Sequence, residues 1–268
     1  MQGPAGQAVP LTAGVASRWG AIVGEVVLSK VLILGGTEEA RQLADALVGM
    51  GHEVITSLAG KTSDPLLPKG EMRMGGFGGA DGLARYLKAE GIERLVDATH
   101  PFAVEMSANA AWAAKETGVH LVRLVRPPWA EPHYAFWQHV GSSEDAAAAL
   151  PPGARVMLTV GHKDLSVFLD RTDCAFVVRS IEPLNAELPE HAVAITGRPP
   201  FYVGAETELL RSYGITHLVT KNSGGVQTEA KLQAAQQLRA TVLMIARPER
   251  AAAKEAPTVG RAIAALKL

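Results

Sequence analysis

From residue 30 onwards, short aliphatic runs alternate with stretches that repeat apolar residues at helical spacing. The run at residues 31–34 is entirely aliphatic and is followed by Gly35-Gly36, which is typical of a strand buried on both faces of a parallel sheet. Thr37 can then cap a helix that has one apolar face, and Gly51 stops that helix. The next run, Glu53–Leu58, predicts a second strand.

The alternation continues, and a row of prolines interrupts it once. The pattern predicts a strand at 94–98, an alanine-rich helix at 104–116 and a strand at 119–125. Pro127-Pro128 and Pro132 then remove ladder donors and fix φ, so we expect a domain junction near residue 130. A second series follows, with predicted strands at 155–160, 174–179, 192–196, 217–220 and 241–246, and predicted helices at 142–150, 165–169, 206–213, 229–239 and 259–266.

The two series predict an α/β protein with two Rossmann-like domains, parallel sheets and an interdomain cleft. Residues 30–129 form the first predicted domain and residues 130–268 the second. Thr99 and Arg126 have the same separation as Thr220 and Arg247, and both segments run strand, polar loop, helix, strand, Arg-Pro, which favours two related halves. Residues 1–29 lack a basic segment ahead of a continuous apolar run, so we interpret them as a flexible extension.

Loops that follow parallel strands share one rim of the sheet, and the first of them contains candidate cofactor residues. Glycine lets the backbone approach a pyrophosphate, and the free N–H groups of a helix start favour its charge. The spacing departs from G-x-G-x-x-G, so a simple tight turn is the alternative interpretation. The candidates in this loop are Gly35, Gly36, Thr37, Glu38 and Arg41.

The end of the second predicted strand favours NADPH over NADH. An NAD-preferring site places a carboxylate there to bind the ribose hydroxyls. This chain instead has Ser57, Gly60, Lys61 and Thr62, and a hydroxyl with a cation suits the 2′-phosphate of NADP. The alternative is that Lys61 is a solvated loop residue.

The third loop, after the strand at 94–98, has polar groups that would face the nicotinamide end of a dinucleotide. Thr99 and His100 are the candidates there, with Asn109 on the helix behind them, and His100 could donate a hydrogen bond or a proton. The alternative is that Asp97 and Thr99 only cap the next helix and that His100 is structural.

A fourth polar loop, Lys221 to Gly225, follows a strand of the second half and can bind carboxylates or phosphates through side chains and backbone amides. Other cations stand near predicted strand ends, although most surface cations are only solvated. The candidates for substrate binding are Asn109, Arg123, Arg126, Lys163, Arg179, Lys221, Ser223 and Gly224, and Arg198 is a further cation nearby.

Composition narrows the function classes. Lys and Arg total 26 against 27 Asp and Glu, so no global positive field favours nucleic acid or an anionic membrane. No apolar run approaches the roughly 18 to 20 residues that span a bilayer. The single cysteine, Cys174, excludes an intrachain disulfide and a cysteine-built metal site, so we expect no metal and a cytoplasmic location.

The strings ILGGTEEARQLADAL, SLAG, VDATHPFAVEMSANAAWAAKETGVHLVRLVRPPW, TVGHKDLSVF and VTKNSGGVQTEAKLQAA resemble the precorrin-6A reductase family, including its cobalt-precorrin-6A form. The resemblance covers roughly residues 30 to 248, so the extension lies outside it. It implies two Rossmann-like domains, with NADPH on the first and a tetrapyrrole between the two. Hydride transfer to a ring double bond, in a pathway to vitamin B12, is the implied reaction.

The resemblance also implies roles for particular residues. Gly36, Thr37 and Arg41 would contact the dinucleotide phosphates, and Ser57 and Gly60 the adenosine end. Thr99 and His100 would lie by the nicotinamide, while Lys221, Ser223 and Gly224 would close the cleft.

Several alternatives remain open at this point. The proton could come from His100, from solvent or from a substrate group. The substrate could be metal-free or hold cobalt, and we expect a monomer or a weak homo-oligomer. An NADPH-binding regulatory protein, or another Rossmann-type reductase without a tetrapyrrole substrate, is the alternative function.

Overall fold

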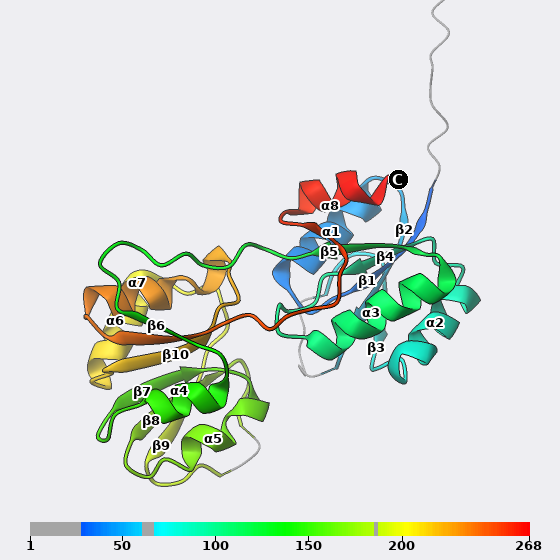
Figure 1. Ribbon diagram of the computed structural model, residues 1–268. Coiled ribbons are helices and arrows are strands. Elements are labelled where there is room, and N and C mark those ends of the chain that lie inside the picture. Colours follow the sequence, from blue (N-terminus) through cyan, green and yellow to red (C-terminus); the bar gives the residue numbers. More distant parts are fainter. Residues whose placement is uncertain (1–27, 61–66, 185–186) are drawn as a thin grey trace, which may run out of the picture.

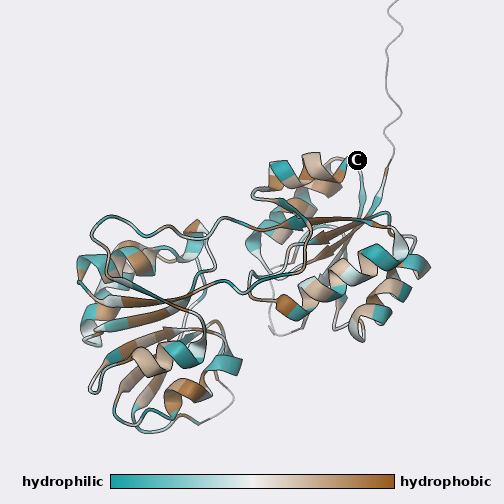
Figure 2. Cartoon of the chain, in the orientation of Figure 1, coloured by the Kyte–Doolittle hydropathy of each residue, from teal (hydrophilic) through white to brown (hydrophobic). Residues whose placement is uncertain are grey.

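The structure is a computed structural model that describes residues 28–60, 67–184 and 187–268. Two six-stranded sheets, each with all strands parallel, form two lobes joined by two crossing segments of the chain (Figure 1). Strands are hydrophobic in the interior of each lobe and hydrophilic residues lie on the outer helices (Figure 2). The predicted α/β class with two Rossmann-like domains is confirmed.

The first sheet has the strand order β12-β5-β4-β1-β2-β3. Its strands are β1 (Lys30–Leu34), β2 (Glu53–Leu58), β3 (Glu71–Met74), β4 (Arg94–Asp97), β5 (His120–Leu124) and β12 (Lys254–Ala256). Its helices are α1 (Glu38–Gly49), α2 (Gly79–Ala89), α3 (Val104–Thr117) and α8 (Val259–Leu266).

Strand β1 explains why this sheet is covered on both faces. Val31 and Ile33 pack into the core beneath α1 and α8, whereas Leu32 and Leu34 pack into the core beneath α2 and α3. Side chains alternate across a strand, so an unbroken aliphatic run supplies both cores. The glycine pair after β1 is therefore held at a fixed position on the rim.

The second sheet has the order β6-β11-β10-β7-β8-β9. Its strands are β6 (Trp137–Val140), β7 (Arg155–Thr159), β8 (Ala175–Ser180), β9 (Ala192–Thr196), β10 (His217–Lys221) and β11 (Thr241–Ile245). Its helical elements are α4 (Ser143–Ala149), η1 (His162–Asp164), α5 (Ser166–Leu169), α6 (Val203–Ser212), η2 (Val226–Thr228) and α7 (Ala230–Gln237).

The two domains exchange a strand and a helix. The chain leaves β5 for β6 in the second sheet, and it leaves β11 for β12 in the first sheet. Position by position, the two orders then match: β12 corresponds to β6, β5 to β11, and β4 to β10. The predicted similarity of the two halves is thus confirmed for the segments around Thr99 and Thr220.

The exchange corrects the predicted boundary of the second domain. Residues 130–268 were assigned to it as one block, but β12 pairs with β5. Ala256, Ala262 and Leu266 are buried in the same core as Val31. The apolar face of α8 therefore completes the first domain, and the second domain ends where β11 leaves it.

Candidate cofactor and substrate site

The loop between β1 and α1 is a backbone cradle. Gly35 N–H donates to the Ser57 carbonyl at 2.8 Å, and a Cβ at Gly35 would lie 2.9 Å from Thr56 Cγ2. Gly36 has a φ of +106° and open space where a Cβ would be. Thr37 caps α1 by accepting from Ala40 N–H at 3.2 Å, and its hydroxyl donates to the Ala98 carbonyl at 2.8 Å. The helix start is thus capped by one side chain but has open space beside Gly36, and this space favours a phosphate.

The acidic and basic residues in the first turn of α1 pair with other side chains. Arg41 forms an ion pair with Glu38, and Gln42 also donates to Glu38. Glu39 accepts from Arg126 Nη1 at 2.7 Å. The predicted cofactor residues Glu38 and Arg41 therefore lie together beside the loop.

At the end of β2, a cation that the sequence analysis missed lies next to Ser57. Arg73, from β3, donates from Nη1 to Ser57 Oγ at 3.0 Å and to the Gly75 carbonyl at 2.9 Å. Its guanidinium carbon lies 3.8 Å from the centroid of the Phe77 ring. Gly60 ends the same strand region with a φ of +71°. Lys61 and Thr62, the other two predicted residues here, lie outside the described residues.

A hollow of about 200 Å³ lies between the β3–α2 loop and the start of α3. Phe77 and Met106 give it apolar walls, and Asn109 gives it an amide. Asn109 was predicted to bind substrate, but the structure brings it close to the Arg73 end of the rim. Phe77 connects the two features, because Arg73 lies over its ring.

The β4–α3 loop contains a buried carboxylate. Asp97 accepts from the Thr99 hydroxyl at 2.6 Å and from Arg123 Nε at 3.0 Å. Burial alone would raise the pKa of Asp97, but hydrogen bonds from Thr99, Ser107 and Arg123 outweigh it and hold that pKa below its usual value. Thr99 thus binds Asp97, and the alternative that it caps α3 is wrong, because the N-cap of α3 is Ala103 without a side-chain cap.

His100 is neutral at physiological pH and accepts a hydrogen bond at one ring nitrogen. The backbone N–H of Phe102 donates to Nδ1 of His100 at 3.3 Å, so in the neutral ring the proton lies on Nε2. The pKa of His100 is lowered to about 3, first by desolvation and then by nearby positive charges, although part of the side chain is exposed to solvent. Those charges belong to Arg126, Lys221, Arg247 and Lys231. With this pKa, His100 can donate a hydrogen bond but holds no acidic proton in the free protein.

Lys231, at the start of α7, is a second group that the sequence analysis missed. Its side chain is buried and its Nζ lies 5.0 Å from the centroid of the Trp129 ring. Burial first, and then repulsion by Arg179 and Arg126, lowers its pKa to about 7, although Glu206 opposes this. The junction between the domains therefore has one cation that can lose its proton close to neutral pH.

The loop from Lys221 to Gly225 packs against the first crossing segment. Arg126 Nε donates to the Ser223 carbonyl at 2.8 Å, and the Asn222 side chain accepts from Trp129 N–H at 2.8 Å. Gly224 has a φ of +69°, and a Cβ there would lie 2.0 Å from the Pro127 carbonyl oxygen. The loop therefore needs glycine at this position for close packing.

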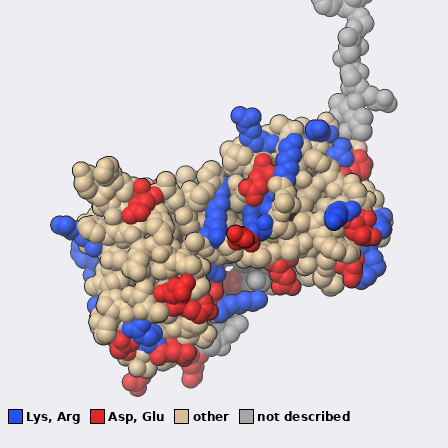
Figure 3. All heavy atoms as spheres, in the orientation of Figure 1, with Lys and Arg blue, Asp and Glu red and all other residues tan. Residues whose placement is uncertain are grey.

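Lys221 connects this loop to both domains. Its Nζ lies 2.6 Å from Asp164 Oδ2 in the second domain and 5.1 Å from the centroid of the Phe102 ring in the first. Lys163, next to Asp164, is exposed. On the face shown in Figure 3, basic side chains gather where the two lobes meet.

Arg179, on β8, is a buried cation with a carboxylate partner in the second domain. Its Nη1 is 2.6 Å from Glu206 Oε1, and its guanidinium carbon is 4.0 Å from the centroid of the Phe201 ring. Both charged side chains are buried, so the pair neutralises itself within the second domain. The prediction that Arg179 binds substrate finds no support in this geometry.

Two further features of the described part of the chain concern metal ions and membranes. Within residues 28–60, 67–184 and 187–268, no cluster of three His, Cys, Asp or Glu side chains could hold a metal ion. Over the same ranges, every helix is too short or too polar to cross a bilayer. Cys174 is a buried free thiol.

These features define a protein of two Rossmann-like domains with a glycine loop at the start of its first sheet. The model of the family described as precorrin-6x reductase CbiJ/CobK matches residues 30–267. The chain therefore belongs to the CbiJ/CobK precorrin-6x reductase family.

Individual relatives agree with this assignment. The chain is 48% identical over 223 residues to a precorrin-6A reductase of Rhodococcus erythropolis, covering 82% of this chain and 90% of the relative. It is 34% identical over 235 residues to a cobalt-precorrin-6A reductase of Priestia megaterium, covering 82% and 91%. A solved CobK precorrin-6A reductase structure is 42% identical, with a TM-score of 0.86, and 90% of this chain and 96% of that chain are covered.

Proposed function

We propose that this protein reduces one ring double bond of precorrin-6A with NADPH, giving precorrin-6B on the route to cobalamin. The observation that carries the proposal is the open glycine cradle at a capped helix start, in a chain of the precorrin-6x reductase family. Metal-free precorrin-6A is favoured over the cobalt form by identity. The relatives named precorrin-6A reductase are 43 to 48% identical, against 29 to 34% for those named cobalt-precorrin-6A reductase.

The residues present fit a dinucleotide along the rim of the first sheet. Gly35, Gly36 and Thr37 would hold the pyrophosphate, because a side chain at Gly36 would fill the open space there. The adenosine would lie toward Ser57 and Gly60. When bound, NADPH supplies the hydride.

Preference for NADPH over NADH rests on Arg73 in this proposal. The guanidinium next to Ser57 stands where a carboxylate would stand in an NAD-preferring site. A guanidinium pairs well with the oxygens of a phosphate. The function predicted for Lys61 is thus extended to a residue of β3.

The remaining site residues would orient the substrate and exclude water. His100 would offer its Nε2 proton as a hydrogen bond beside the nicotinamide, together with the Thr99 region of the loop. Arg126 of the first crossing segment would line the tetrapyrrole site together with Lys221 and the Ser223–Gly224 backbone of the second domain. Adding a hydride to one carbon requires a proton on its neighbour. His100, whose pKa is lowered to about 3, is a poor source in the free protein, so water or a substrate group would supply that proton.

The proposal also covers the setting of the enzyme. We place it in the cytoplasm, where a buried free thiol such as Cys174 remains reduced. A monomer is sufficient, because one chain supplies both domains and both sides of the junction.

Anaerobic mixing of the purified protein with NADPH and precorrin-6A tests the proposal. We expect the absorbance of reduced nicotinamide to fall only when the tetrapyrrole is present, with slower turnover of cobalt-precorrin-6A. NADPH binding without oxidation would instead identify a regulatory protein. Equal rates with NADH would remove the role given to Arg73.

A further inference from the structure

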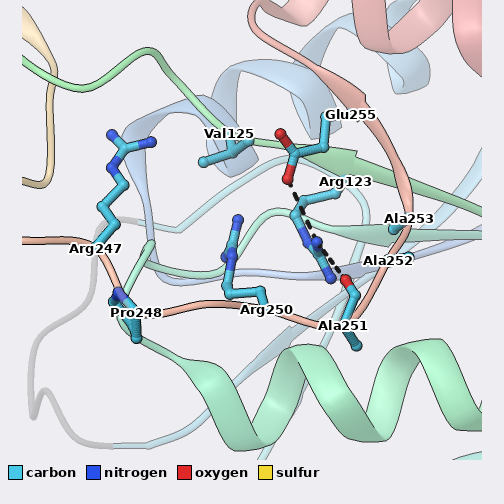
Figure 4. Close-up of a pocket in the computed structure, with 9 residues that line it drawn as sticks. All are labelled: Arg123, Val125, Arg247, Pro248, Arg250, Ala251, Ala252, Ala253 and Glu255. Carbon is cyan, nitrogen blue, oxygen red and sulfur yellow. Dashed lines mark hydrogen bonds and ion pairs between the residues drawn. The ribbon is translucent and has the colours of Figure 1, made fainter.

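A basic hollow of about 250 Å³ lies where the second crossing segment returns to the first sheet (Figure 4). Arg123, on β5, forms one wall, and Arg247 and Arg250 of the crossing segment form another. Val125 contributes an apolar surface, and Glu255 contributes the one acidic side chain of the lining. The hollow exists only because β12 follows β11 back into the first domain.

Arg123, which lines this hollow, has a buried donor without a partner among the described residues. The side chain is 2% exposed; its Nε binds Asp97, and its Nη1 donates to the Ala251 carbonyl at 2.8 Å. Nη1 also lies 3.4 Å from Glu255 Oε1, but the buried Nη2 makes no hydrogen bond to any described residue. A buried charged donor left unsatisfied is costly. Nη2 has almost no accessible surface, so a ligand oxygen would reach it only after a small shift of the crossing segment, and that contact would recover free energy.

Arg247 and Arg250 have spare donors as well. Arg247 donates from Nε and Nη2 to the carbonyls of Asn222 and Ser223. Arg250 donates from Nη1 to Ser107 Oγ at 3.3 Å. Burial first, and then neighbouring arginines, lower the pKa of Arg250 and bring that of Arg247 to about 10. An anion among these guanidinium groups would relieve the repulsion between them.

We propose that Arg123, Arg247 and Arg250 form a carboxylate-binding site that holds one acid side chain of the tetrapyrrole and so fixes the orientation of the macrocycle. The proposal rests on the proposed function and adds a substrate site to it. A phosphate of the cofactor is the alternative anion for this hollow, but the glycine cradle proposed to bind the pyrophosphate lies at the end of β1. Strands β4 and β5 follow β1 in the sheet, which puts Arg123 about 10 Å away, on the side opposite to Ser57.

The site would give a function to the crossing segment between β11 and β12. Arg247 and Arg250 come from a segment that leaves the second domain, whereas Arg123 belongs to the first. A carboxylate bound to all three would connect both domains through the substrate. Substrate binding would thus stabilise the relative arrangement of the two sheets.

Steady-state kinetics with precorrin-6A and NADPH test the site through two substitutions that should change KM for precorrin-6A in opposite directions. Arg250→Gln removes a cation and should raise KM for precorrin-6A about tenfold or more, because a charge-assisted hydrogen bond is lost. Glu255→Gln removes the competing carboxylate, which is 56% exposed, and should lower that KM. KM for NADPH should stay unchanged in both. Arg211→Gln, at an exposed arginine of α6, is the matched control and should behave as wild type.

Other results of these measurements would contradict the carboxylate site. An unchanged KM for precorrin-6A in both variants overturns the site, and a rise confined to KM for NADPH assigns the hollow to a cofactor phosphate instead. If Arg250→Gln fails to fold by circular dichroism, Glu255→Gln alone decides.

A wild-type protein that turns over no precorrin-6A overturns the proposed function, and the hollow is then judged by fluorescence titration with uroporphyrin. Weaker uroporphyrin binding by Arg250→Gln than by wild type would support the carboxylate site, and equal binding would overturn it.

Discussion

Arg126 and Arg247 donate hydrogen bonds to the same acceptor, the Ser223 carbonyl oxygen, from Nε at 2.8 Å and from Nη2 at 3.0 Å. Each arginine begins one of the two segments that cross between the domains (Figure 1). The loop after β10 is therefore held by both crossings at once. Glu39 adds a contact to α1 by pairing with Arg126 at 2.7 Å. These contacts connect the start of α1, the domain junction and the loop from Lys221 to Gly225.

Gly224→Ala should destabilise this junction. The new Cβ would lie 2.0 Å from the Pro127 carbonyl oxygen at a φ of +69°, so both the loop and the crossing segment must move. We expect the free energy of unfolding to fall by about 3 kcal/mol, with weaker binding of precorrin-6A. Urea denaturation measures the first effect, and KM the second.

Gly91→Ala is the matched control for that change. Gly91 also has a positive φ, +62°, but a Cβ there meets nothing within 4 Å. Only the backbone strain remains, which costs about 1 kcal/mol. Equal losses in the two variants would show that contact with Pro127 is unimportant.

Local patterns predicted the central strands because these are buried on both faces. The unbroken aliphatic run of β1 predicts a buried strand. By contrast, β3 (Glu71–Met74) has no buried residue and β12 has only one, Ala256, so neither shows a hydrophobic pattern. Polar edge strands resemble loops in sequence. The helix α2 was also missed, although Leu83 and Leu87 stand at helical spacing and are buried. The return of α8 to the first domain depends on long-range pairing, which no local pattern contains.

In the candidate site, too, residues placed by local sequence could be predicted, and residues placed by long-range pairing could not. The cradle at Gly35 to Thr37 is local, so its residues could be named from sequence. Arg73 and Arg250 could not, because their positions depend on β3 and on the exchanged connection. Arg179 was named as a substrate residue because it ends a strand, but its partner Glu206 lies 2.6 Å away on α6, far along the chain.

Thr37→Glu should weaken NADPH binding about tenfold, because a carboxylate would repel the pyrophosphate and the helix cap would be lost. Thr37→Ser keeps the oxygen that accepts from Ala40 and should bind NADPH as wild type. Fluorescence titration of NADPH measures both. Unchanged affinity in Thr37→Glu would remove the cofactor from this loop.

Arg73→Gln should reduce the preference for NADPH over NADH. The guanidinium next to Ser57 would interact with the 2′-phosphate, which NADH lacks, so only the KM for NADPH should rise, by roughly tenfold to a hundredfold. Arg85→Gln, at an exposed arginine of α2, serves as the control. A parallel rise in both KM values would assign Arg73 to folding of the Phe77 region, because the guanidinium lies over that ring.

His100→Gln should alter the pH dependence of stability in a defined direction. The pKa of His100 is about 3 in the folded protein against the ordinary 6.5. Between these two values the imidazole is protonated in the unfolded chain but neutral in the folded protein. As pH falls from about 6.5 toward 3, this linkage destabilises wild type, and the variant, which has no such group, becomes relatively more stable. Urea denaturation at several pH values measures the difference between the two proteins.

The same variant tests the assignment of His100 as a hydrogen-bond donor. Gln retains an N–H donor, so His100→Gln should keep a measurable kcat, whereas His100→Ala should lose more. A neutral imidazole also predicts that kcat/KM in wild type shows no ionisation of His100 between about pH 5 and 8. An acidic limb near pH 6.5 that disappears in His100→Gln would instead make His100 a titrating catalytic group, with its pKa returned to the ordinary range.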